Sequence, residues 1–206
     1  MSSRFAFGLF FFVALSLLLG ACGEESPSAP PAADPATLGW TVLDPSGLNE
    51  GQQAQQQRAF QAKDALFASL SGKLVSKMQE SGPAAAVSYC KTAAPEIHAQ
   101  AGSSHALKIG RTSFKLRNPE NVAPDWAQGF VNEKRAEPVV LAHEDGRLAS
   151  LLPIRMMKLC TRCHGGEGQL DADAIEEVRR LYPDDKAIDF AEGDLRGWFW
   201  IEVPKP

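Results

Sequence analysis

The chain has 206 residues, with 21 Lys and Arg residues against 25 Asp and Glu residues, for a formal charge of -4. This balance excludes the strongly basic surface typical of nucleic-acid-binding proteins, so no nucleic-acid partner is expected. Hydrophobic residues make up 44% of the chain and aromatic residues 8%, which excludes wholesale disorder. The length fits one domain with an appended segment.

The first 21 residues have the pattern of a secretory signal peptide. Arg4 supplies a positive charge near the start, and Phe5–Leu19 is an uncharged, mostly apolar run. This run is shorter than the roughly 20 residues that a membrane-spanning helix needs. Residues 1–21 are therefore expected to direct export and to be removed.

Small residues precede Cys22 in the run Leu19-Gly20-Ala21-Cys22, which resembles the cleavage region of bacterial lipoproteins. In that class the cysteine thiol receives a diacylglyceryl group and its amine a further acyl chain, and several chains give stable anchoring. Gly23 follows, where an aspartate would favour the inner membrane, so the outer membrane is favoured. We expect lipidation of Cys22, membrane contact through the anchor, and a domain in the periplasm.

Residues 22–48 begin with a stretch rich in Pro, Ala and Ser that contains no large apolar side chain before residue 36. Such a composition cannot build a core. The segment is predicted to be a tether, and residues 49–206 are predicted to form the folded domain.

A long helix is predicted over Asn49–Glu80, because apolar residues recur at helical spacing. Asn49 and Gln52 match the capping-box pattern at its start. Gly82 and Pro83 then break the chain.

A second helix is predicted over Pro83–Lys91, and it places Val87, Cys90 and Ala94 on one face. Pro95 is expected to end or kink it. Cysteine is often a small core residue, but a free thiol is unusual in an oxidising compartment. The pattern therefore leaves two roles open for Cys90, packing and ligation.

Four segments favour β-strands, and the two central ones are joined by the turn Glu144-Asp145-Gly146. Asp171–Tyr182 is predicted to be a helix capped by Asp171, with Glu176 paired to Arg180. Helices that precede an antiparallel sheet indicate an α+β fold. The four strand segments are 106–111, 138–143, 147–154 and 197–203.

The run Cys160-Thr161-Arg162-Cys163-His164 is the C-x-x-C-H signature of covalent haem attachment. Two thiols at this spacing can form thioethers with the two vinyl groups of haem, and the adjacent imidazole can ligate the iron. Gly165 and Gly166 allow the chain to turn away close to the macrocycle. The single motif predicts one haem c, bound through Cys160 and Cys163, with His164 as the proximal iron ligand.

The second axial ligand is not fixed by the motif. No methionine follows His164, and Met156 and Met157 lie too close upstream to reach the opposite face easily. The remaining candidates for the sixth iron ligand are Cys90, Met78, His98, His105 and His143.

Arg111, Arg117 and Lys115 are candidates for charge-assisted hydrogen bonds to haem propionates. Surface ion pairs are their alternative role.

Further motifs run through the domain in order. They are A-V-S-Y-C at 86–90 with A-P at 94–95, R-T-S-F-K-L-R-N-P-E-N at 111–121, P-D-W at 124–126, C-T-R-C-H at 160–164, Y-P-D-D-K-A at 182–187 and G-D-L-R-G at 193–197. In these motifs the chain resembles a family of single-haem c-type proteins with a PAS-like fold, long catalogued as a domain of unknown function. It departs from the family at Asp189, where glycine is usual, and in the bulky Trp198 and Trp200.

The resemblance implies N-terminal helices packed on a PAS-like antiparallel sheet, with the covalent haem at the mouth of the sheet. It also implies that Cys90 is the distal iron ligand, opposite His164. A thiolate ligand stabilises ferric iron, so a low reduction potential is expected.

The expected function is that of a periplasm-facing, membrane-anchored c-type haem protein in redox sensing, diatomic-gas sensing or electron transfer. The chain contains no kinase, cyclase or DNA-binding output, so a redox or signalling partner is expected. No acid/base constellation indicates an enzyme. The alternative is a binding module without haem, in which Cys90, Cys160, Cys163 and His164 form a Cys₃His zinc site.

Overall fold

The computed structural model describes residues 32–206. The predicted signal peptide and the predicted lipidation site Cys22 lie outside these residues. Within residues 32–206, no helix is both long enough and apolar enough to span a membrane.

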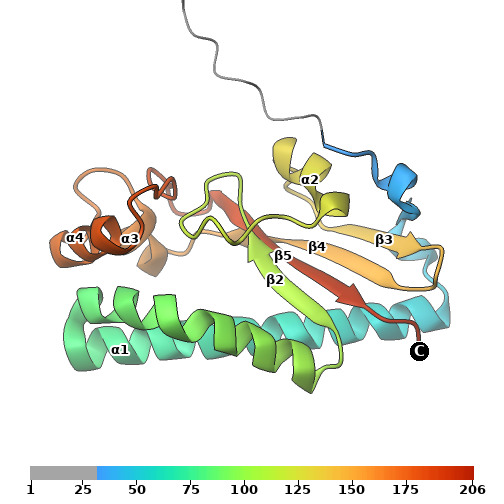
Figure 1. Ribbon diagram of the computed structural model, residues 1–206, viewed down its shortest axis with the longest axis horizontal. Coiled ribbons are helices and arrows are strands. Elements are labelled where there is room, and N and C mark those ends of the chain that lie inside the picture. Colours follow the sequence, from blue (N-terminus) through green and yellow to red (C-terminus); the bar gives the residue numbers. More distant parts are fainter. Residues whose placement is uncertain (1–31) are drawn as a thin grey trace, which may run out of the picture. The chain divides into compact units, whose positions relative to one another are not determined.

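A five-stranded sheet forms the centre of the fold (Figure 1), and each strand is antiparallel to its neighbours in the order β1-β3-β4-β5-β2. The predicted α+β class is confirmed, since helices pack on an antiparallel sheet, although β1 comes before the long helix in the chain. The strands are β1 (Trp40–Leu43), β2 (Lys108–Thr112), β3 (Val139–His143), β4 (Leu148–Arg155) and β5 (Leu195–Val203).

Helix α1 (Glu50–Ser104) is a hairpin of two arms that lie side by side (Figure 1). The chain turns at Gly82, whose φ of 82° and ψ of 175° are not helical, as the break at Gly82-Pro83 predicts. Leu66 from the first arm packs in one cluster with Ile97 from the second. The predicted capping box is confirmed, because the side chains of Asn49 and Gln52 each accept a hydrogen bond from the other's backbone N–H.

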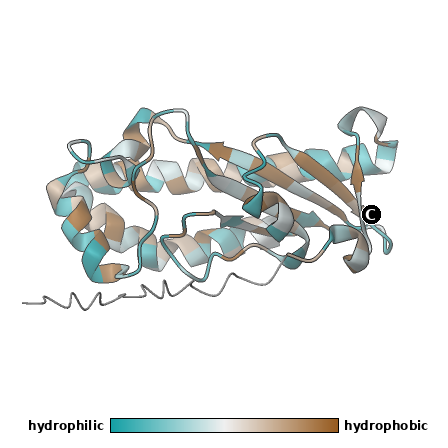
Figure 2. Ribbon diagram, turned by 90° about the horizontal axis from the view of Figure 1, so that it is seen from above, coloured by the Kyte–Doolittle hydropathy of each residue, from teal (hydrophilic) through white to brown (hydrophobic). Residues whose placement is uncertain are grey.

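The sheet is covered differently on its two faces, because successive side chains of a strand point to opposite sides. Phe199 and Ile201 of β5 pack against the α1 hairpin. Trp198 packs on the other face against α2 (Asp125–Asn132), with Trp126 of that helix. Hydrophobic residues accordingly concentrate along the strands, while the hairpin mixes hydrophilic and hydrophobic positions (Figure 2).

Two short helices lie beyond the sheet, over the end of α1 where the hairpin turns (Figure 1). The one-turn helix α3 (Thr161–His164) follows β4, and α4 (Ala172–Leu181) packs on the second arm of α1. The chain then returns through residues 182–194 into β5. The predicted haem motif therefore lies between the end of β4 and the start of β5.

In the structure, residues that the sequence analysis assigned to the tether pack with the domain. Residues 40–43 form the edge strand β1, in which Trp40 is opposite His143 of β3. Trp40 and Leu48 are both buried, at 5% and 6% exposure. Pairing with β3 turns this short segment into a strand, so the folded unit already includes residues 35–48.

Three local predictions also differ from the structure. Pro95 does not end the second arm, which continues as helix to Ser104. Arg180 pairs with Glu177 rather than Glu176, because Glu177 also accepts a hydrogen bond from Ser88 of α1. The side chain of the α4 N-cap residue, Asp171, makes no capping bond and binds Arg162 instead.

The hairpin turn provides a matched pair of stability measurements. Gly82 has a backbone conformation that residues with a side chain rarely adopt, so Gly82→Ala is expected to cost about 1–3 kcal/mol of unfolding free energy. Gly72 lies in the regular first arm, and Gly72→Ala is expected to stabilise by up to about 1 kcal/mol. An added Cβ meets no atom within 4 Å at either site. Urea unfolding that gave the two variants equal stability would contradict this account of the turn.

Candidate functional site

The C-x-x-C-H residues form one compact turn. Cys160 ends the 3-10 turn η3 (Lys158–Cys160), and Cys163 and His164 lie on α3. A Cβ on Gly165 would lie 2.5 Å from the carbonyl oxygen of Thr161, so only glycine fits where the chain leaves α3. The expected role of Gly165 is thus supported by a steric reason, whereas a Cβ on Gly166 would meet only an ordinary contact.

The imidazole of His164 is held in one tautomer. Its Nδ1 lies 2.7 Å from the carbonyl oxygen of Ala187. A carbonyl can only accept, so Nδ1 carries the proton and Nε2 keeps its lone pair. Burial and the charges of Arg117 and Arg196 lower the pKa of His164 well below 6.5, against the effect of the Ala187 bond. The ring is therefore neutral at pH 7, which is the form that binds a metal.

Arg117 joins the C-x-x-C-H turn to residues 185–187, which include the carbonyl that binds the His164 ring. Its Nη2 donates to the carbonyl oxygen of Cys163 at 2.6 Å and to Oδ2 of Asp185 at 2.9 Å, and its Nε donates to the same Oδ2 at 3.1 Å. The other carboxylate oxygen of Asp185 accepts from the backbone N–H of Ala187 at 2.9 Å. This chain of bonds fixes the carbonyl that His164 uses.

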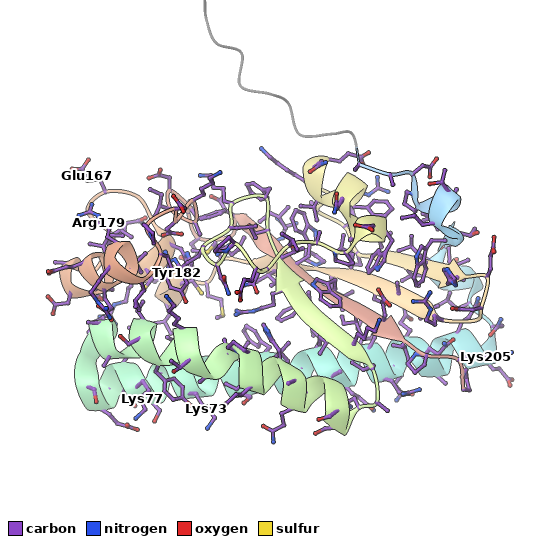
Figure 3. All side chains as sticks on the ribbon, in the orientation of Figure 1. Lys73, Lys77, Glu167, Arg179, Tyr182 and Lys205 are labelled. Atoms are coloured by element: carbon purple, nitrogen blue, oxygen red, sulfur yellow. The ribbon has the colours of Figure 1, made fainter. Side chains whose placement is uncertain are left out.

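Cys90 lies on the second arm of α1, which is fastened to α4 on both sides of the thiol. Ser88 donates to Glu177, and Lys91 Nζ donates to the carbonyl oxygen of Leu181 at 2.9 Å. One turn before Cys90, Val87 packs in a cluster that also contains Cys163 and Tyr182. Tyr182 ends α4 on the side that faces the hairpin (Figure 3).

The cysteines of the described chain are free thiols. Cys90, Cys160 and Cys163 form no disulfide and are partly buried. Burial raises the pKa of Cys90 above its usual value, while the charges of Arg111 and Arg117 lower it. Burial likewise raises the pKa of Cys163, against the charge of Arg117. Without a metal the thiols of Cys90 and Cys163 are protonated at neutral pH, and a bound metal would deprotonate a coordinating thiol.

Two further arginines surround the site. Arg111 Nε donates to Nε2 of His98 at 3.2 Å, and burial lowers the pKa of His98 to about 4, so this histidine is a neutral acceptor. Arg196 Nη1 donates to the carbonyl oxygen of Lys115 at 3.2 Å, and its guanidinium lies over the Phe190 ring at 5.3 Å. Burial lowers the pKa of Arg196 to about 10, and that of Arg111 below its usual value.

Several predicted site residues lie in one region: Arg117 bonds to Cys163, and the charges of Arg111 and Arg117 act on both Cys90 and His164. Other histidines have separate roles, since His143 lies against the Trp40 ring and beside the Leu38 carbonyl, and His105 is the C-cap residue of α1. The sequence reasoning did not single out Arg196, Asp185, Tyr182 or the Ala187 carbonyl as site groups. All four fall inside the C-terminal motifs at 182–187 and 193–197, which are the signal that could have pointed to them.

The zinc alternative finds no support in this geometry. In the described residues 32–206, no three His, Cys, Asp or Glu side chains are grouped closely enough to hold a metal ion. The four members of the proposed Cys₃His set therefore form no such group in these residues.

Comparison with known proteins gives one family and one solved fold. A family model described as Tll0287-like matches residues 48–204, which is most of the chain. The crystal structure titled as that of the cyanobacterial heme-protein Tll0287 is similar, with a TM-score of 0.51 and 18% identity over 77% of this chain and 98% of that chain. At this identity the likeness concerns the fold alone. No curated protein matches.

The Arg117–Asp185 tie can be tested by unfolding. The two side chains are only 14% and 7% exposed, so Arg117→Gln leaves a carboxylate without its charge partner in a poorly hydrated position. We expect a loss of about 3–5 kcal/mol in unfolding free energy. The control is Arg180→Gln, which breaks an ion pair whose arginine is 65% exposed and is expected to cost less than about 1 kcal/mol. Equal costs in urea titrations would show that the tie does not hold the site together.

Proposed function

The chain belongs to the Tll0287-like family, and we propose that it is a c-type haem protein carrying one haem c bound covalently through Cys160 and Cys163. The similar solved structure is, by its title, that of a heme-protein. The observation that carries the proposal is the pairing of the C-x-x-C-H motif with a His164 whose Nδ1 is bonded to Ala187, so that Nε2 is free to bind iron.

The residues fit such a group in three ways. The thiols of Cys160 and Cys163 are unpaired and sit on one turn. The imidazole of His164 is neutral and fixed. The aromatic and aliphatic side chains of Phe190, Ala187 and Met156 pack with Cys160, which supplies an apolar wall.

A covalently held haem c would supply an iron that exchanges one electron. We propose that His164 Nε2 and the sulfur of Cys90 are its two axial ligands. Cys90 fits this role because its arm of α1 packs on α4 beside Cys163, and because the charges of Arg111 and Arg117 partly offset the burial that raises the pKa of its thiol. The combination of imidazole and thiolate favours the oxidised iron and hence a low potential.

For the cellular role we propose electron transfer or redox sensing ahead of sensing of a diatomic gas. Gas sensing at this site requires Cys90 to leave the iron. The bonds from Ser88 to Glu177 and from Lys91 to Leu181 hold the Cys90 arm against α4 on either side of the thiol. This fastening favours a ligand that stays in place.

We further propose that the protein works at a bacterial membrane from the periplasmic side, most simply the outer membrane, through a lipid on Cys22. The apolar run before Cys22 and the small residues at 20–21 support this. The role requires a redox or signalling protein partner, and we propose that it is not enzymatic.

The covalent attachment is tested by maturing the full chain in a host that attaches haem to exported C-x-x-C-H proteins. The intact protein is expected to gain the mass of one haem and to keep its Soret absorbance after acid-solvent extraction. Cys160→Ala combined with Cys163→Ala should lose both signals, because both thioethers are removed. Cys90→Ala is the matched control for loss of a thiol, and it should retain the mass of one haem. Colourless wild-type protein from a competent host would refute the proposal.

A further inference from the structure

The site holds more positive than negative charge. Arg111, Arg117 and Arg196 surround the motif, and each is partly buried. The carboxylate that faces them is that of Asp185, which is bound to Arg117. Arg111 and Arg196 form no ion pair within residues 32–206, and Lys115, whose Nζ lies 5.1 Å from the centre of the Phe190 ring, adds a further positive charge beside them. Partly buried charges are costly unless they are paired, so this arrangement calls for an anion.

The three arginines differ in how many of their N–H donors remain unused. Arg117 already donates to Cys163, Asp185 and Ala187. Arg111 uses only its Nε, and Arg196 uses only Nη1, within residues 32–206. Each guanidinium has five N–H donors in a planar fork. Arg111 and Arg196 therefore each retain several unused donors.

The unused donors lie beside the residues that attach and ligate haem. The Phe190 ring, which stacks under Arg196, packs with Cys160, and the backbone N–H of Phe190 donates to the carbonyl oxygen of His164 at 3.0 Å. The charge of Arg196 acts on His164, and that of Arg111 acts on both His164 and Cys90. The surplus positive charge is thus located at the attachment site itself.

Both guanidinium groups are also held by fixed neighbours. The bond to the neutral His98 fixes Arg111 through Nε, which leaves its two terminal nitrogens unused. The Arg196 guanidinium is held by the carbonyl oxygen of Lys115 and by the Phe190 ring, and its backbone carbonyl oxygen accepts from Ser113 at 2.7 Å. Preorganised forks of this kind suit carboxylates, which they can bind through two parallel bonds.

We propose that Arg196 and Arg111 bind the two propionate carboxylates of the haem, while Arg117 is a positioning residue that holds the attachment segment. The inference rests on the proposed function. It assigns Arg196 a role that its sequence context did not indicate. It also gives Arg117, a candidate for propionate binding in the sequence, a structural role instead. Two carboxylates match the two arginines of the site that form no ion pair within residues 32–206.

The test uses the full chain matured with haem and compares Arg196→Gln and Arg111→Gln with the wild type. Resonance Raman bands of propionate bending report the hydrogen bonds of the carboxylates, and each variant is expected to shift them. Loss of a nearby positive charge should also lower the reduction equilibrium constant on the order of tenfold, which is about 59 mV for a one-electron couple. Arg196→Lys, which restores the charge without the fork, should recover most of the potential but not the band positions.

Arg179→Gln is the matched control, because Arg179 is exposed and projects from the outer side of α4 (Figure 3). It should change neither the bands nor the potential. Unshifted propionate bands in Arg196→Gln, with or without a change in potential, would overturn the inference while leaving the bound haem in place. If Arg196→Gln does not fold, the propionate bands of Arg196→Lys provide the test instead. Shifted bands support the inference, and unshifted bands overturn it. Wild-type protein without haem would refute the proposed function and the inference together.

Discussion

The hydrogen bond between Nδ1 of His164 and the carbonyl oxygen of Ala187 is the contact on which the rest of the site depends. It decides which nitrogen of the ring carries the proton, and thus that the free lone pair is on Nε2. The bond exists only because residues 185–190 fold back over α3, where Phe190 N–H reaches the His164 carbonyl and Arg117 joins Asp185 to Cys163. A motif of five consecutive residues therefore needs groups from 20 and more residues away to become a ligand site.

The proposed ligation by Cys90 also requires this thiol to lie near the motif. Residues 90 and 163 are distant in sequence, and the turn at Gly82 sends the second arm of α1 back along the first. The first arm and the sheet form a rigid base through Leu66, Ile97 and Ile201. Val87 and the bonds of Ser88 and Lys91 then fasten the arm to α4. The sheet serves as a support for the site and supplies Arg111 and Arg196 from its paired strands β2 and β5.

Several features of the fold and of the site could be predicted from local sequence patterns, because they depend on residues that are close in sequence. The capping box of Asn49 and Gln52, the break at Gly82, the hairpin at Glu144-Asp145-Gly146 and the haem motif each depend on a few adjacent residues. Strand β1 could not be predicted in the same way, since its four residues become a strand only by pairing with β3. The position of Arg196 depends on an irregularity in the β4–β5 register, where Gly197 is opposite Ile154 but Leu195 is opposite Arg155. The choice of Glu177 over Glu176 depends on Ser88 from another helix.

The central claim is that His164 and Cys90 ligate the same iron. X-ray absorption at the iron edge, recorded on the matured full chain in both oxidation states, tests it most directly. The account predicts one sulfur neighbour beside the porphyrin and imidazole nitrogens, retained on reduction and absent in Cys90→Ala. A sulfur signal that survives in Cys90→Ala, or a wild-type spectrum with nitrogen neighbours alone, would contradict it.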